Sequence, residues 1–208
     1  MREAFGIKTI FYCGYGEAIP KNRRTDMWYV IQTITGKEEE LSRAVSAYLS
    51  PQICEDCFTV KRRFIRRLGG EWVTVKEILF PSYLFLETAK PEQLFYELKK
   101  IPEYTRLLGD NDGSFISLET EEEEFLKKIC HREGRDMVAE LTDLYLDEKG
   151  EIVRADGPLR FFLDKIVKLN LRKRLAVTEL TIAGRKQTAV FGIRLRREEL
   201  QEKSNHGG

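Results

Sequence analysis

Runs of apolar residues, alternating segments and helical periods follow one another along this chain. The densest apolar run is Leu79–Glu87, with the sequence LFPSYLFLE. A run this continuous does not suit an amphipathic helix and predicts a strand that is buried on both faces at the centre of a sheet. Pro81 cannot donate to a ladder, so we expect it at the first residues of the strand or at a bulge.

Side chains alternate along a strand, so Tyr83 and Phe85 fall on one face and Leu84 and Leu86 on the other. We expect the two leucines to lie in the core. For the two aromatic rings the sequence leaves two interpretations open. They either fill the core, as large rings usually do, or form a docking surface for a partner.

The patterns on either side of this run predict a domain with the order β-α-β-β-β-α-β-β-α and a mostly antiparallel sheet. Gly69-Gly70 indicates a hairpin turn, Pro91 suits the first turn of a helix, and Thr120 is the expected capping residue of the last helix. The other predicted strands cover residues 27–33, 58–68, 72–76, 104–108 and 115–118, and the other predicted helices cover residues 37–49 and 91–100. A turn is expected at 109–113.

The remaining chain predicts a second, smaller domain. Residues 132–149 have mixed polarity and no clear strand, and are interpreted as a linker. From Gly150, four short alternating segments (151–155, 164–171, 174–182 and 185–195) suit a small closed barrel. We therefore expect an α+β protein with domains at 27–131 and 150–200 and a tail at 201–208. Residues 1–26 are expected to be a flexible arm or sequence upstream of a start at Met27.

Charge is distributed unevenly over these segments. Residues 150–208 hold 13 Lys and Arg against 7 Asp and Glu, whereas residues 27–149 hold 17 against 24. A basic second domain after an acidic first one suggests a polyanion as partner of the second domain. Within the first domain the hairpin is basic and carries an aromatic residue; its members are Lys61, Arg62, Arg63, Arg66, Arg67 and Trp72.

Candidate catalytic chemistry is sparse. Cys54 and Cys57 have the CxxC spacing of a redox pair or of half a zinc site, for which Cys130 and His131 are the nearby further ligands. With two histidines and no serine triad, phosphate loop or carboxylate pair, the sequence predicts a protein that is not an enzyme and holds no metal or cofactor. The short apolar patch at 10–13 does not suit a signal peptide or a membrane span, so we expect a cytoplasmic protein.

The order of these motifs resembles the NusG family of transcription elongation factors over most of residues 27–200. The resemblance rests on four motifs: Trp28-Tyr29-Val30, Phe80–Phe85, Ile101-Pro102 and Gly150–Leu195. The last stretch matches the KOW pattern through Val153, Asp156-Gly157-Pro158 and Gly184-Arg185. The resemblance implies an NGN-like sheet with flanking helices and an SH3-like KOW barrel. The amino-acid sequence of Phe80–Phe85 resembles that of specialised paralogues of the LoaP and RfaH type more than that of the general factor.

This resemblance also implies a function. It implies a monomeric antiterminator whose first domain docks on RNA polymerase, with Phe80, Pro81, Tyr83 and Phe85 at or under the contact surface. The basic hairpin would lie near upstream or non-template DNA. One departure is Asp164, which stands where the family's KOW motif usually has a glycine and which tolerates left-handed φ better than most residues. That departure puts binding to Rho and to the ribosomal partner in doubt.

For the second domain, the basic turns predict binding of a nascent RNA hairpin through its phosphates. The residues at these turns are Arg172, Lys173, Arg174, Arg185 and Lys186. Three alternatives remain. The basic residues can be simply solvent-exposed, the protein can be a ribosome-associated RNA-binding protein that shares only the KOW-type barrel, or Cys54 and Cys57 can carry thiol redox chemistry.

Overall fold

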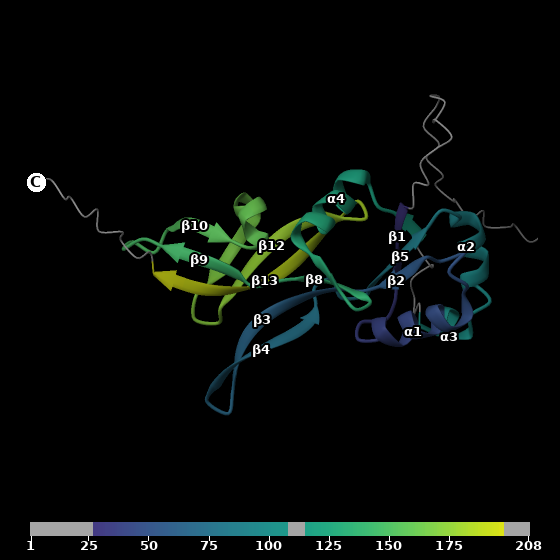
Figure 1. The fold of residues 1–208 in the computed structure, drawn as a ribbon, viewed down its shortest axis with the longest axis horizontal. Coiled ribbons are helices and arrows are strands. Elements are labelled where there is room, and N and C mark those ends of the chain that lie inside the picture. Colours follow the sequence, from purple (N-terminus) through teal and green to yellow (C-terminus); the bar gives the residue numbers. More distant parts are fainter. Residues whose placement is uncertain (1–26, 108–114, 198–208) are drawn as a thin grey trace, which may run out of the picture.

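A computed structural model describes residues 27–107 and 115–197 (Figure 1). The N-terminal sheet has the strand order β2-β5-β1-β6, and its neighbours all run antiparallel. Its strands are β1 (Met27–Gln32), β2 (Asp56–Phe58), β5 (Tyr83–Thr88) and β6 (Phe115–Ser117). The apolar run therefore does form an inner strand, with Val30 of β1 opposite Phe85.

Three helices cover one face of this sheet, namely α1 (Glu38–Tyr48), α2 (Pro91–Leu98) and α3 (Pro102–Leu107). Leu41 and Val45 of α1 and Leu94 and Leu98 of α2 pack in one core with Leu84 and Leu86. The expectation for these two leucines is confirmed, since both are fully buried. The opposite face of the sheet carries Tyr83 and Phe85, which belong to a second core.

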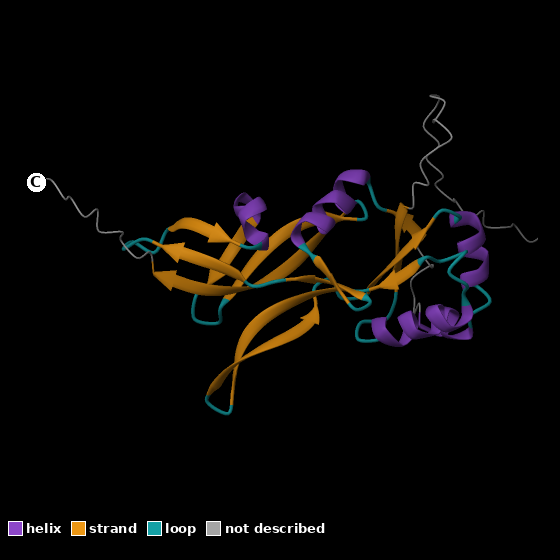
Figure 2. Cartoon of the chain, viewed as in Figure 1, coloured by secondary structure: helices purple, strands orange, loops and turns teal. Residues whose placement is uncertain are grey.

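A second sheet is built around the basic hairpin and has the order β4-β3-β8-β7. Its strands are β3 (Val60–Leu68), β4 (Glu71–Ile78), β7 (His131–Glu133) and β8 (Asp136–Ala139). The short strand β8 runs parallel to the start of β3, while β3 and β4 continue as a two-stranded ribbon that projects from the body (Figure 2). We call this the hairpin sheet.

The C-terminal sheet has the order β10-β9-β13-β12-β11. Its elements are β9 (Thr142–Leu146), β10 (Ile152–Asp156), the 3-10 turns η1 (Pro158–Phe161) and η2 (Leu163–Lys165), β11 (Ile166–Asn170), β12 (Leu175–Ile182) and β13 (Arg185–Arg197). The long strand β13 pairs with β12 through its first half and with β9 through its second half.

Helix α4 (Thr120–Ile129) lies between the N-terminal and C-terminal sheets. Its Phe125 ring meets Phe162 at 5.1 Å between centroids, and Phe162 in turn meets Phe191 of β13 at 5.2 Å. Residues of α4, of the N-terminal sheet and of the C-terminal sheet therefore share one continuous core.

The structure corrects several sequence predictions. Residues 132–149 include β8 and β9, so the expectation of a strand-free linker is wrong; these strands pair with distant partners, which local periodicity does not reveal. The expected strand at 104–108 is helix α3, whose first residue is Pro102, a residue that suits a first helical turn. The last helix is capped by Glu119 rather than by Thr120.

The closed barrel is not found among the described residues either, because β10 and β11 stand at opposite ends of the sheet order and do not pair. Asp164 lies in η2 and does not have positive φ. The expected arm at 1–26, turn at 109–113 and tail at 201–208 lie outside the described residues. No helix in ranges 27–107 and 115–197 has the length and apolar character needed to cross a membrane.

Candidate functional site

The Phe80–Phe85 stretch enters the sheet through a tight turn. Pro81 precedes β5 and is exposed, and Ser82 adopts a left-handed φ of 70°. The buried carboxylate of Glu38 accepts a hydrogen bond from the backbone N–H of Ser82 at 2.7 Å. Glu38 thus fixes this turn, since it satisfies a backbone donor in a conformation that non-glycine residues rarely adopt.

Three of the four residues proposed for polymerase contact are buried. Phe80, Tyr83 and Phe85 are 2%, 3% and 0% exposed. Phe85 stacks on Phe58 at 5.6 Å and tilts against Phe80 at 6.3 Å between ring centroids. Their face of the N-terminal sheet is therefore closed to solvent in this arrangement.

The C-terminal sheet supplies the contacts that close this face. The amide Nε2 of Gln187 on β13 donates to the Tyr83 hydroxyl at 2.6 Å. The Glu122 carboxylate on α4 accepts from the backbone N–H groups of Ala183 and Gly184, at 3.0 Å and 3.2 Å. Arg185 donates to the side-chain oxygen of Gln32 at 3.3 Å. A charge-assisted clamp on the β12–β13 turn and an apolar core thus hold the two sheets together.

The basic hairpin residues divide into two groups. Near the body, Lys61 pairs with Glu39 and Asp136, at 2.6 Å and 2.8 Å. Arg63 pairs with Glu133 and Glu140. Because carboxylates of the protein already neutralise these two cations, they are less able to bind the phosphates of a nucleic acid.

Arg62 is enclosed by the C-terminal sheet. Its guanidinium donates to the carbonyl oxygen of Val190 on β13 and lies 5.0 Å from the Phe64 ring centroid. Burial lowers the pKa of Arg62 from its ordinary value, although Glu77 opposes this effect. Arg62 therefore joins the hairpin sheet to the C-terminal sheet instead of facing solvent.

At the outer end of the hairpin the basic residues are more open. Arg67 stands opposite Trp72 in the β3–β4 ladder, and Arg66 stands opposite Val73. Alternation places Arg67 and Trp72 on one face of the ribbon and Arg66 on the other. Arg66 lies 3.7 Å from Glu77, whereas no salt bridge of Arg67 occurs within the described residues. Trp72 as a whole residue is 52% exposed.

The basic turn between β11 and β12 lies beside this end of the hairpin. Arg174, with a left-handed φ of 59°, places its guanidinium 5.7 Å from the Trp72 ring centroid. Its carbonyl accepts the N–H of Ile193 at 3.0 Å, and Lys173 N–H is held by Asn170 at 2.9 Å. The turn is thus fixed to β13 on one side and lies next to Trp72 on the other.

Arg185 and Lys186 lie at the other end of β12. They follow the β12–β13 turn, whereas Arg172, Lys173 and Arg174 precede β12. The whole length of an eight-residue strand, about 26 Å, separates the two basic turns. The structure therefore does not bring the five predicted RNA contacts together.

The CxxC cysteines are buried and free. Burial and the neighbouring Asp56 raise the pKa of Cys54 to about 12, and burial raises the pKa of Cys57 further. Because the thiolate is the reactive species, neither thiol suits redox catalysis at neutral pH.

One group of potential metal ligands was missed in the sequence. His131, Glu133 and Glu140 bring one ligand atom each within 4.8 Å of one another, but Arg63 pairs with both carboxylates and Lys76 pairs with Glu133. Two cations already neutralise the carboxylates, so the group works as an ion-pair network at the junction of β7 and β8. The signal is weak in sequence because Arg63 lies far from its partners.

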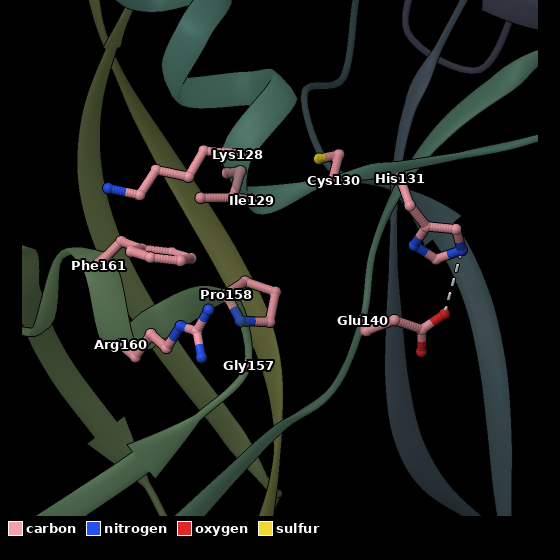
Figure 3. Close-up of a pocket in the computed structure, with 9 residues that line it drawn as sticks. All are labelled: Lys128, Ile129, Cys130, His131, Glu140, Gly157, Pro158, Arg160 and Phe161. Atoms are coloured by element: carbon pink, nitrogen blue, oxygen red, sulfur yellow. Dashed lines mark ion pairs between the residues drawn. The ribbon is translucent and has the colours of Figure 1, made fainter.

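A shallow pocket of about 270 Å³ lies beside this network, between the end of α4 and η1. Figure 3 shows His131 with Glu140 on one side and Lys128, Arg160 and Phe161 on the other. The Lys128 ammonium lies 4.2 Å from the Phe161 ring centroid, and the Arg160 guanidinium lies 4.5 Å from it. Both cations thus rest on one aromatic ring.

Comparison with known proteins gives a consistent result. A family model described as "Transcription termination factor nusG" matches residues 26–127. A protein named "Transcription termination/antitermination protein NusG" from Rickettsia prowazekii is 25% identical over 170 residues, which cover 76% of this chain and 82% of that protein. A protein of the same name from Rickettsia bellii is 26% identical over 173 residues, covering 77% and 84%.

A protein of the same name from Helicobacter pylori is 23% identical over 164 residues, covering 76% of this chain and 90% of that protein. Among solved structures, one titled "Domain interaction in Thermotoga maritima NusG" aligns with a TM-score of 0.43 and 16% identity, over 81% of this chain and 94% of that one.

Proposed function

We propose that this chain, whose residues 26–127 match the family model described as "Transcription termination factor nusG", is a transcription termination/antitermination factor of that family and acts by binding and not by catalysis. The observation that carries the proposal is the family match, together with relatives of that name aligned over about three quarters of the chain. The buried, protonated thiols of Cys54 and Cys57 support a non-enzymatic role.

The specific role proposed is antitermination on RNA polymerase, in the manner of the specialised LoaP-type paralogues and in the cytoplasm. The N-terminal sheet docks through the face of Phe80, Pro81, Tyr83 and Phe85. Because the C-terminal sheet covers three of these residues, docking requires the Gln187–Tyr83 and Glu122 contacts to break. The form seen here is the closed form, and the docking form is an open one.

The proposed nucleic-acid partner is nascent RNA, bound as a hairpin by Arg172, Lys173 and Arg174. No salt bridge of these three residues occurs within ranges 27–107 and 115–197, and Arg172 and Lys173 are exposed. Unpaired cations at a fixed turn suit phosphate contacts. The alternative of a ribosomal RNA-binding protein that shares only the C-terminal sheet is less well supported, because the family match lies at residues 26–127, outside that sheet.

Co-purification with RNA polymerase tests the docking proposal. Glu122→Ala combined with Gln187→Ala removes polar contacts of the closed form and should increase the yield of polymerase. Glu124→Ala combined with Thr188→Ala changes exposed neighbours on the same two elements and should leave the yield unchanged. Adding Tyr83→Ala to the Glu122→Ala, Gln187→Ala variant should lower the yield of polymerase again. Equal polymerase yields from all folded variants would contradict docking through this face.

Readthrough of a terminator in vitro tests the antitermination proposal. The template carries a leader that is transcribed into an RNA hairpin, and the control template carries a leader of equal length without one. We expect the protein to increase readthrough more on the first template. No increase on either template would overturn the antiterminator role, and equal increases would overturn the requirement for the hairpin.

A further inference from the structure

The outer end of the β3–β4 hairpin and the β11–β12 turn lie together, although they belong to different sheets and the sequence suggested different partners for them. The contact between them is the Arg174 guanidinium, 5.7 Å from the Trp72 ring centroid. Trp72 as a whole residue is half exposed, so Arg174 occupies part of its surroundings and leaves the rest open to solvent.

Three further cations surround this pair. Arg67 lies opposite Trp72 in the ladder, on the same face of the ribbon, and donates to the carbonyl oxygen of Gly70 at 2.9 Å. Arg172 and Lys173 are exposed in the turn that carries Arg174. None of these cations has a salt bridge in the described part of the chain, in contrast to Lys61 and Arg63 near the body.

From this arrangement we propose that Arg67, Trp72, Arg172, Lys173 and Arg174 form one composite RNA surface that spans the hairpin sheet and the C-terminal sheet. An unpaired base of the RNA stacks on the open face of Trp72, and the neighbouring phosphates lie against the four cations. Exposed aromatic rings next to unpaired cations have the chemistry that binds a strand with free bases.

The two faces of the β3–β4 ribbon show which of the two adjacent arginines belongs to the composite surface. Alternation turns Arg66 away from Trp72, and the Arg66 guanidinium lies 3.7 Å from the Glu77 carboxylate. The composite surface therefore uses Arg67 and not Arg66, although both arginines are adjacent in sequence and partly open. Hydrogen bonds from Ile193 to Arg174 and from Lys173 to Asn170 fix the turn on the C-terminal sheet.

The inference rests on the proposed RNA partner. It adds the β3–β4 hairpin of the protein to the RNA-binding surface, whereas the sequence had linked this β-hairpin to DNA. It also implies that this RNA surface exists in the closed form, since both sheets contribute to it. A protein whose C-terminal sheet has moved away would retain Arg172 and Lys173 but lose Trp72 and Arg67 from the same surface.

Titration of the full chain with three probes tests the proposal: a short RNA hairpin with an unpaired loop, a fully paired RNA duplex, and the loop sequence as single-stranded DNA. Trp72→Ala should weaken binding of the RNA hairpin at least about fivefold, the low end for loss of a stacking aromatic residue. Trp72→Phe should retain most of the affinity. Arg67→Ala should weaken binding and reduce its salt dependence.

Two charge controls match Arg67→Ala. Arg66→Ala changes the opposite face of the same ribbon, and Lys90→Ala removes an exposed cation where α2 begins, on the far side of the N-terminal sheet. Both should change the affinity for the hairpin less than twofold. Circular dichroism confirms that each variant is folded.

Tryptophan fluorescence gives an independent measurement, because the other tryptophan, Trp28, is 2% exposed and acts as an internal reference. RNA should quench the wild-type signal but not that of Trp72→Phe. Hairpin binding that depends on Arg172 and Lys173 but not on Trp72, without quenching, would overturn the composite surface and leave the proposed RNA partner intact. Absence of any RNA binding would overturn both, and equal affinity for the single-stranded DNA would overturn the assignment to RNA.

Discussion

The hydroxyl group of Tyr83 in the N-terminal sheet accepts a hydrogen bond from Nε2 of Gln187 in the C-terminal sheet at 2.6 Å. Gln32 donates to the same hydroxyl at a longer 3.4 Å. Tyr83 is therefore both a residue of the proposed docking face and a polar contact that keeps this face covered. A substitution can remove the hydroxyl and keep the ring, so the two roles can be tested separately.

Tyr83→Phe keeps the ring and removes the acceptor, which leaves the Gln187 amide without this partner. We expect the closed arrangement to lose about 1 kcal/mol, the usual net value of one hydrogen bond. The amide groups of Ala183 and Gly184 report this loss, because they donate to Glu122 only when the β12–β13 turn is packed against α4. Their hydrogen exchange should become roughly fivefold faster.

The Leu49 amide at the end of α1 donates to Val45 within its own helix and is the control, so its exchange should not change. Equal acceleration at all three amides would show that the substitution destabilises the whole protein. Unchanged exchange at Ala183 and Gly184 would mean that the Tyr83 hydroxyl does not hold the sheets together.

The sequence predicted the interior of the N-terminal sheet well, because the run that forms β5 is the most apolar in the chain. Alternation correctly separated Tyr83 and Phe85 from Leu84 and Leu86. It could not show what lies over the aromatic face. That depends on contacts such as Gln187 with Tyr83, between residues far apart in sequence, and no local pattern encodes them.

The same reason explains the errors around residues 132–149. Strand β8 has four residues, too few for alternation to be evident, and it pairs in parallel with β3, far upstream in the sequence. The neighbourhood of Trp72 and Arg174 is nonlocal in the same way. For α3, by contrast, a local signal was present, since Pro102 and Glu103 suit a first helical turn.

Thiol labelling tests whether the buried cysteines are unreactive in the folded protein. Burial raises the pKa of Cys54 and Cys130 to about 12 and raises the pKa of Cys57 as well. We expect all three to react slowly with iodoacetamide at pH 8 in the folded protein and rapidly in urea, as measured by peptide mass spectrometry. Rapid labelling of Cys54 without denaturant would contradict this expectation, and so would loss of readthrough activity in folded Cys57→Ser.

The Lys61–Asp136 pair should make part of the stability depend on pH. Burial alone would raise the pKa of Asp136, but hydrogen bonds from Lys61 and Thr59 outweigh it and hold the pKa below the ordinary value of 3.8. A carboxyl whose pKa is lower in the folded state stabilises the protein above its unfolded pKa and loses that effect as the pH falls through the folded value.

Asp136→Asn should therefore destabilise the protein most at pH 5 to 7, and the difference from wild type should shrink as the pH falls below about 4. Urea unfolding at several pH values measures this difference. Asp164→Asn, in an exposed carboxyl, is the control and should show little difference throughout. A penalty for Asp136→Asn that stays constant down to pH 3 would show that the charge of Asp136 does not stabilise the β3–β8 junction.

At Gly192 the C-terminal sheet lies directly against the backbone of the hairpin sheet. A Cβ atom at this position would lie 2.3 Å from the carbonyl oxygen of Arg63 and 2.5 Å from the Cα of Phe64. Both are backbone atoms of β3, so they cannot rotate away as a side chain could. Gly192→Ala must push β13 away from β3 or deform one of the strands.

We expect Gly192→Ala to lower the free energy of unfolding by about 1–3 kcal/mol, the usual cost of overpacking. Separation of the strands should also loosen the Arg62 contact with Val190 and speed exchange at Ala183 and Gly184. Gly134→Asn is the matched control, because nothing lies within 4 Å of that position and asparagine tolerates its φ of 62°. If Gly192→Ala is no more destabilising than Gly134→Asn, the two sheets are not packed as tightly as β13 and β3 indicate.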